Sequence, residues 1–216
     1  MRIFILLCLT LSGTAGAHEF FSTKVTWTRE ISRIIAKRCL ECHSEGRKAF
    51  SLATYADARP WAKAIKEEVL NRRMPPWGAA KGFGDFVPDH ALSQEEISLI
   101  ADWVEGGAPE GDRLLLPPMR PTALPQTASI AKRKVPLPAA ALPAQLRIRG
   151  IIPGPGVAPG TQLAAQRPDG TVEPLIWIVE PRAATGRTFA LREPITLPKA
   201  SRIVKQGSGA FSILVD

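Results

Sequence analysis

The chain uses cysteine and histidine sparingly, yet it places three of these residues within five consecutive positions. Its 216 residues include three cysteines and three histidines, and one run reads Cys39-Leu40-Glu41-Cys42-His43. Side chains three positions apart lie on the same face of a helical turn, so both thiols would point toward a common partner. The histidine that follows would offer that partner a neutral imidazole nitrogen. No other feature constrains the local structure and chemistry as strongly.

Cys-x-x-Cys-His is the attachment signature of c-type haem. Each cysteine would form a thioether with one haem vinyl group, and the adjacent histidine would be the proximal ligand of the iron. The sequence therefore predicts one covalently attached haem c. It would be bound through Cys39 and Cys42, with His43 as an axial iron ligand.

Three other uses of the motif fit less well. A thioredoxin-like redox pair needs a βαβ context, whereas the flanking sequence has helical periodicity. A structural zinc site needs four ligands, and the only other histidines are His18 and His90. A plain disulfide would leave His43 without a purpose. Haem attachment is the interpretation that uses all three residues.

The N-terminus has the pattern of a secretory signal peptide. Arg2 is followed by the apolar stretch 3–11 and by the small residues Ala15-Gly16-Ala17. This order predicts a signal peptide over residues 1–17, with cleavage near Ala17 and a periplasmic or secreted mature protein. An uncleaved membrane anchor is the alternative, but the apolar stretch is short for a bilayer span.

Three amphipathic helices are expected around the motif. The first, in "VTWTREISRIIAKR", has an apolar face made of Trp27, Ile31, Ile34 and Ile35. The last, in "LSQEEISLIADWVEGGAP", begins at a Ser93–Glu96 capping box and stops at Gly106-Gly107. Its apolar stripe should be Ile97, Ile100, Ala101 and Val104. The middle one should have Asp57 as N-cap and Pro60 in its first turn, with an apolar stripe of Trp61, Ile65 and Val69.

The middle helix must end at "RRMPPW", because Pro75 and Pro76 cannot continue it. Met74 is then presented from a stiff loop, and its thioether is predicted to be the second axial iron ligand. The alternatives are a core-filling role for Met74 and ligation by Met119 instead.

Three residues near Met74 are candidate haem contacts. Arg72 and Arg73 could pair with haem propionates, or they could complement the negative end of the helix dipole. Trp77 could pack on the haem edge, although core packing is the better-supported role for it. His90 precedes a helix and is expected to be a solvated loop residue, with distal ligation of the iron as the second choice.

Residues from about 26 to 112 resemble the mono-haem cytochrome c domain of secreted bacterial proteins. The resemblance is carried by "CLECH", "YADARPWAKAIKE", "MPPW" and "LSQEEISLIADWVEGGAPEGD". It implies a helical haem domain in which Cys39 and Cys42 carry the haem, and His43 and Met74 bind the iron.

The second half resembles a fragment of the β-sandwich of copper type II, ascorbate-dependent monooxygenases. The runs "RPDGTVEPLIWI" and "REPITLPKASRI" carry this likeness. Where related copper domains have a His-x-His pair, this chain reads Pro153-Gly154-Pro155-Gly156, and no histidine follows His90. Hydroxylase activity is therefore not expected, because a type II copper site depends on imidazole ligands.

These patterns predict an α+β fold class organised as two domains. An all-α haem domain would span residues 18–116, a Pro-rich extended linker 117–143, and a small β-rich domain 144–216. The charge is uneven: residues 18–118 carry 14 basic and 15 acidic side chains, and residues 119–216 carry 13 and 5.

The expected function is electron transfer by an exported c-type cytochrome with His/Met-ligated iron. A haem-bearing subunit or domain of a periplasmic oxidoreductase or monooxygenase-like enzyme, and a haem-based ligand sensor, remain alternatives. The basic second half could dock an acidic periplasmic redox partner or an anionic membrane surface. Nucleic acid is not an expected partner, because the exported chain has no aromatic-basic binding motif.

Overall fold

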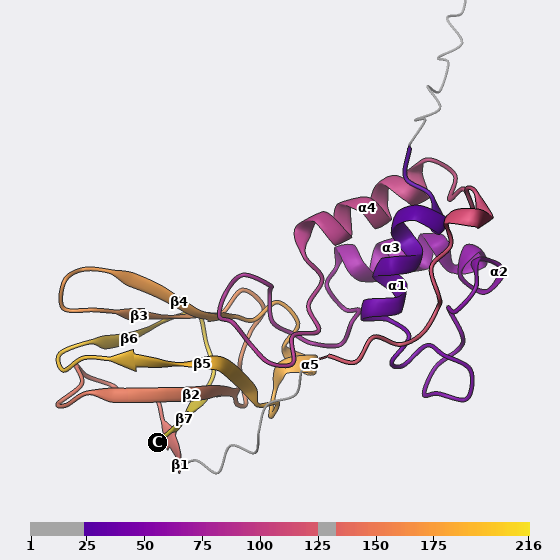
Figure 1. Ribbon diagram of the computed structural model, residues 1–216. Helices are drawn as coiled ribbons and strands as arrows, with labels where there is room; N and C mark the ends of the chain where they lie inside the picture. The colour runs from indigo at the N-terminus through magenta and orange to yellow at the C-terminus, as the bar shows by residue number, and fades with distance from the viewer. Residues whose placement is uncertain (1–23, 125–132) are drawn as a thin grey trace, which may run out of the picture.

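The computed structural model describes residues 24–124 and 133–216, so the predicted signal peptide lies outside the described residues. The fold is α+β, with an N-terminal helical region and C-terminal antiparallel sheets, as the sequence predicted at this level. Figure 1 shows the helices gathered at one end of the molecule and the strands at the other. Within the described ranges, no helix is long and apolar enough to cross a membrane.

The helical half packs around two longer helices, α3 and α4. Its elements are η1 (Trp27–Ile31), α1 (Ser32–Arg38), α2 (Tyr55–Ala58), η2 (Arg59–Trp61), α3 (Ala62–Leu70), α4 (Gln94–Glu105) and η3 (Arg113–Leu115). All four residues of the predicted first apolar face are buried, so that prediction is confirmed. They pack in one cluster with Ile97, Ile100 and Trp103 of α4.

The capping box of α4 forms as predicted. The Ser93 Oγ accepts a hydrogen bond from the Glu96 N–H at 3.0 Å, and the Glu96 carboxylate accepts one from the Ser93 N–H at 2.8 Å. Gly106 is the C-cap, and Gly107 has a φ of +85°. The buried stripe differs in part, because Trp103 is buried whereas Ala101 and Val104 are half-buried.

The start of the middle helix differs from the prediction. Thr54, not Asp57, is the N-cap, because the Thr54 hydroxyl accepts a hydrogen bond from the Asp57 N–H at 3.1 Å. Pro60 lies in the 3-10 turn η2, whose three-residue period rotates Trp61 away from the buried face of α3. Trp61 is 46 % exposed, and of the predicted stripe only Val69 is buried.

The C-terminal half consists of two antiparallel sheets. A four-stranded sheet has the order β1-β7-β2-β5, and a three-stranded sheet has the order β4-β3-β6. The elements are β1 (Arg133–Pro136), β2 (Leu146–Pro153), β3 (Gln162–Gln166), β4 (Val172–Trp177), α5 (Pro181–Ala184), β5 (Phe189–Leu197), β6 (Arg202–Gln206) and β7 (Phe211–Val215). The strands expected in "LIWIV" and "FSILVD" correspond to β4 and β7.

Part of the predicted Pro-rich linker belongs to the sheet. β1 lies within range 117–143 and pairs with β7 along four residues, from Arg133–Val215 to Pro136–Ser212. As an edge strand, β1 tolerates a proline that a central strand would not. Leu142, also from that range, is buried in the core of the β half.

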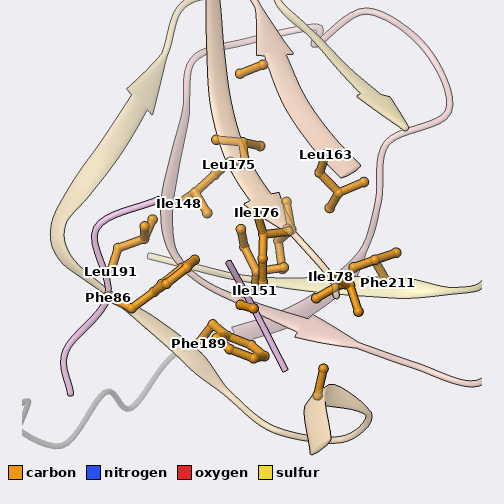
Figure 2. Packing of buried hydrophobic residues seen from close by; sticks show 14 of the residues in the cluster. Phe86, Ile148, Ile151, Leu163, Leu175, Ile176, Ile178, Phe189, Leu191 and Phe211 are labelled. Atoms are coloured by element: carbon orange, nitrogen blue, oxygen red, sulfur yellow. The ribbon is translucent and has the colours of Figure 1, made fainter. Parts of the chain in front are cut away.

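The core of the β half also receives side chains from the segment between α3 and α4. Trp77, Ala79, Phe86 and Ala91 are buried in the same cluster as the strand residues, although they precede the first strand by more than 40 positions. Figure 2 shows Phe86 beside Phe189 and Leu191 of β5. The segment 77–91 therefore packs with the β half, within the range the sequence assigned to the haem domain.

Candidate functional site

The Cys-x-x-Cys-His motif forms a helical turn directly after α1. The Cys39 N–H donates to the Ile35 carbonyl at 2.9 Å, and the His43 N–H donates to the Cys39 carbonyl at 2.9 Å. The Cys42 N–H also donates to the Cys39 carbonyl, at 3.0 Å. Both thiols are free, so the motif is not closed by a disulfide.

The His43 ring is held by a backbone carbonyl. Its Nδ1 lies 2.9 Å from the carbonyl oxygen of Phe50, and that oxygen can only accept, so Nδ1 carries the proton. The Nε2 of His43 then has a lone pair, and the described residues place no hydrogen-bond partner on it. This is the tautomer of a histidine that binds a metal through Nε2.

An exposed aromatic ring lies beside the His43 imidazole, and a second exposed ring stacks on the first. The Phe50 ring meets the imidazole edge-on, with centroids 5.0 Å apart, and stacks on the Trp61 ring at 4.5 Å. Phe50 is 49 % exposed and Trp61 46 % exposed. An apolar surface of this kind next to an imidazole donor fits a flat, largely apolar cofactor.

The chemistry of the Cys39 thiol differs from that of a redox-active cysteine. Burial, together with the charge of Glu96, raises the pKa of Cys39 to about 12. Reactive cysteine pairs have lowered pKa values and sit in electropositive surroundings. The raised pKa and the helical context therefore both argue against a thioredoxin-like role.

The turn that carries the motif is anchored to the start of α4. Arg38 is buried, with its side chain 4 % exposed, and its Nε donates to both carboxylate oxygens of Glu96 at 3.1 and 3.2 Å. Its Nη1 donates to the carbonyl of Asp89 at 3.0 Å. The residue that precedes Cys39 is thereby fixed to two other segments.

Met74 lies on the surface loop that follows α3. It is 42 % exposed, and it lines a shallow pocket together with Val69, Pro75, Gly78, Ala91 and Val179. Its N–H donates to the Glu68 carbonyl at 3.3 Å. Met119, the other candidate thioether, is half-buried and packs against the core of the helical half.

Both arginines that precede Met74 have protein partners. Arg73 forms a two-point ion pair with the Glu68 carboxylate at 2.7 and 2.9 Å, which lowers the pKa of Glu68. Arg72 has a left-handed backbone, with φ of 54°, and its Nη2 donates to the Gln94 Oε1 at 2.9 Å.

Trp77 and His90 lie where the helical and β halves meet. Trp77 is buried, and its ring contacts the rings of Phe189 and His90 at 4.8 and 5.1 Å. The prediction of a solvated His90 is wrong, because this loop folds back onto Trp77 and leaves its side chain only 24 % exposed. Burial lowers the pKa of His90, although Glu41, 3.6 Å away, opposes the shift.

The structure thus brings together Cys39, Cys42 and His43 and places Trp77 in the β core. Sequence reasoning missed Phe50 as a neighbour of His43, and Trp61 as the ring that stacks on Phe50. Both are isolated aromatic residues, and a contact made through the carbonyl of Phe50 leaves no signal in the sequence. The described parts of the chain contain no group of three or more His, Cys, Asp or Glu residues arranged to hold a metal ion directly.

Comparisons of the chain with models of protein families, with curated proteins and with solved structures find no match.

Proposed function

We propose that this chain is an exported c-type cytochrome that transfers electrons through one covalently attached haem. The proposal is carried by the hydrogen bond of 2.9 Å between the His43 Nδ1 and the Phe50 carbonyl. That bond leaves Nε2 as the metal-binding nitrogen, beside two free cysteines in one helical turn. The haem, when bound, would supply a one-electron couple between ferrous and ferric iron.

Each residue of the site has a separate task in this proposal. Cys39 and Cys42 attach the cofactor, and His43 binds the iron. The Phe50 carbonyl fixes the imidazole tautomer and makes the ring a stronger donor. The exposed Phe50 ring, which contacts the imidazole, and the Trp61 ring stacked on it would offer the cofactor an apolar contact surface.

Met74 is the proposed second axial ligand. A thioether is a soft donor that favours reduced iron and raises the potential. Met74 is preferred to Met119 because Met74 lies exposed on a short loop, whereas Met119 is packed against the helical core. Of the two candidate propionate contacts, Arg72 is the better one, because its present partner is the neutral Gln94 amide rather than a carboxylate.

The attachment test uses full-length protein matured in a host that makes c-type cytochromes. The haem should stay with the polypeptide through acid-acetone extraction and denaturing electrophoresis. The double variant Cys39→Ala, Cys42→Ala should retain no covalent haem. Free haem in the organic phase from the unaltered protein would refute the proposal.

The ligation test compares the two methionines directly. Met74→Ala should abolish the weak charge-transfer band of the ferric iron–thioether bond, lower the potential and allow carbon monoxide to bind reduced iron rapidly. Met119→Ala is the matched control and should change none of these. Rapid carbon monoxide binding by the unaltered protein would favour a ligand sensor or an enzyme over an electron carrier.

The proposed partner is an acidic redox protein, because residues 119–216 carry 13 basic and only 5 acidic side chains. Electron transfer to such a protein should slow as ionic strength rises, since salt screens the attraction between exposed charges. No salt dependence, or equal binding to anionic and neutral vesicles, would argue against a partner selected by charge.

A further inference from the structure

The loop that carries Met74 is attached to the β half within two residues of the methionine. The Nη2 of Arg187 donates to the Pro76 carbonyl at 3.1 Å, and the same guanidinium lies 5.2 Å from the centre of the Trp77 ring. The Nε of Arg187 donates to the Ala183 carbonyl of α5 at 3.1 Å. Arg187 thus joins the loop to α5 through one planar group.

Backbone contacts reinforce this attachment. The Gly78 carbonyl accepts hydrogen bonds from the N–H groups of Val179 at 2.9 Å and Glu180 at 3.2 Å. Gly78 has a φ of +88°, and a Cβ at this position would lie 2.6 Å from the Ala184 nitrogen. Only glycine permits both this backbone conformation and so close an approach to α5.

The loop stays on the β half beyond Gly78. The Ala80 N–H donates to the Trp177 carbonyl at 2.9 Å, next to the end of β4. Further on, the Val87 N–H donates to the Ala190 carbonyl at 2.9 Å, and Phe86 forms a bridge with Leu191 of β5. Both β4 and β5 are edge strands, so the loop runs along the open edges of both sheets. Figure 1 shows this segment, in purple to magenta, reaching from the helices to the strands near α5.

On the other side, Met74 is tied to the helical half. The Arg73 N–H and the Met74 N–H both donate to the Glu68 carbonyl near the end of α3, at 2.9 and 3.3 Å. Met74 therefore lies between an anchor on α3 and an anchor on the β half. The backbone on both sides of Met74 is therefore held, which limits the positions that its side chain can reach.

We propose that the β half is a positioning device for the sixth iron ligand, and that Arg187 is its principal positioning residue. This inference rests on the proposed function, because it assumes that Met74 binds the haem iron. It gives the C-terminal sheets a role that needs no metal of their own.

The test uses full-length haem protein and three readouts: the ferric thioether band, the reduction potential and the affinity for added imidazole. Arg187→Ala should weaken the band and tighten imidazole binding by roughly tenfold, the order of effect expected from losing one charge-assisted hydrogen bond. Arg187→Lys should restore part of the band, since an ammonium also donates to a carbonyl. Arg182→Ala is the matched control, because Arg182 is an exposed arginine of α5, five positions before Arg187.

Two further variants separate positioning from general destabilisation. In the Met74→Ala background, Arg187→Ala should leave the imidazole affinity unchanged, because no ligand remains to be positioned. Gly78→Ala, which forces the loop off α5 by a different route, should act in the same direction as Arg187→Ala. Circular dichroism should show that every variant compared remains folded at the assay temperature.

The possible failures are distinguishable. If the unaltered protein has the thioether band and neither Arg187→Ala nor Gly78→Ala changes it, this inference is wrong and the proposed function stands. If Arg187→Ala has its full effect without Met74, it acts on stability and not on the ligand, and the inference is again wrong. If the unaltered protein has covalent haem but no thioether band, ligation by Met74 and this inference fail together.

Discussion

Truncation of Phe86 should reveal how far the two halves of the molecule share one core. Phe86 precedes α4 in sequence, yet it is 2 % exposed in the cluster of the β half, with its ring centre 5.3 Å from that of Phe189. Phe86→Ala should lower the free energy of unfolding of that half by about 3–5 kcal/mol, the usual cost of removing a buried aromatic ring. Loss of the edge-to-face contact with Phe189 is part of that cost.

The assay is thermal unfolding of the full-length protein, followed by circular dichroism for the strands and, once the proposed haem is attached, by haem absorbance for the helical half. For a protein of this size, 3–5 kcal/mol corresponds to a fall in Tm of about 6–20 °C. Phe83→Ala is the control, since Phe83 is half-buried and, among the aromatic residues that the structure describes, contacts only the Trp177 ring; it should cost about 1 kcal/mol. A strand transition at the unaltered temperature in Phe86→Ala would refute the shared core.

Three further measurements test other parts of the structure. Ser93→Ala removes one half of the capping box of α4 and should cost about 1 kcal/mol in urea unfolding, whereas Ser93→Asp should recover most of it. Because burial lowers the pKa of His90 below 6.5, the unfolded chain takes up the proton first; stability should therefore fall as the pH drops below about 6.5, and His90→Gln should flatten that fall. Copper titrated into the full-length protein in either oxidation state should find no tight site within residues 144–216, as mapped by NMR, since that range contains no histidine, cysteine or methionine.

Local rules explain why the ends of α4 could be predicted from the sequence. The capping box depends on two side chains three positions apart, and the helix stop on a pair of glycines, so every atom involved lies close in sequence. The apolar face of the first helix was predictable for the same reason. It needs only a regular period over residues 27–35, and the structure buries all four expected residues.

The same rules failed where a residue could serve two purposes. Thr54 and Asp57 are both good N-cap residues, and the choice between them depends on where the preceding loop enters. Trp61 fits the helical period, but the 3-10 turn at Pro60 rotates it toward Phe50. A periodic pattern assumes an uninterrupted α-helix, and a single tighter turn changes which face a side chain occupies.

Long-range packing could not be predicted from the sequence, for a different reason. An apolar residue in a loop indicates that its side chain is buried in the folded protein, but it does not indicate in which of the two cores. Trp77 and Phe86 looked like parts of the helical half, because they lie between its helices, and they are buried against strands that begin after residue 132. The strand β1 could not be predicted for a similar reason. Proline-rich sequence predicts an extended chain whether or not a partner strand is present.

The position of the 77–91 segment gives the β half a structural role. That role needs no copper-binding histidines. Two antiparallel sheets leave edge strands that must be covered, and here β4 and β5 are both met by this loop. The contacts with these edge strands hold the chain that follows Met74. The Glu68 carbonyl holds the backbone of Met74 itself. In the proposed cytochrome, the fold that closes the sheets would therefore also fix Met74, so a mutation that breaks the contacts of Arg187 or Gly78 with α5 should change the ligation of the iron.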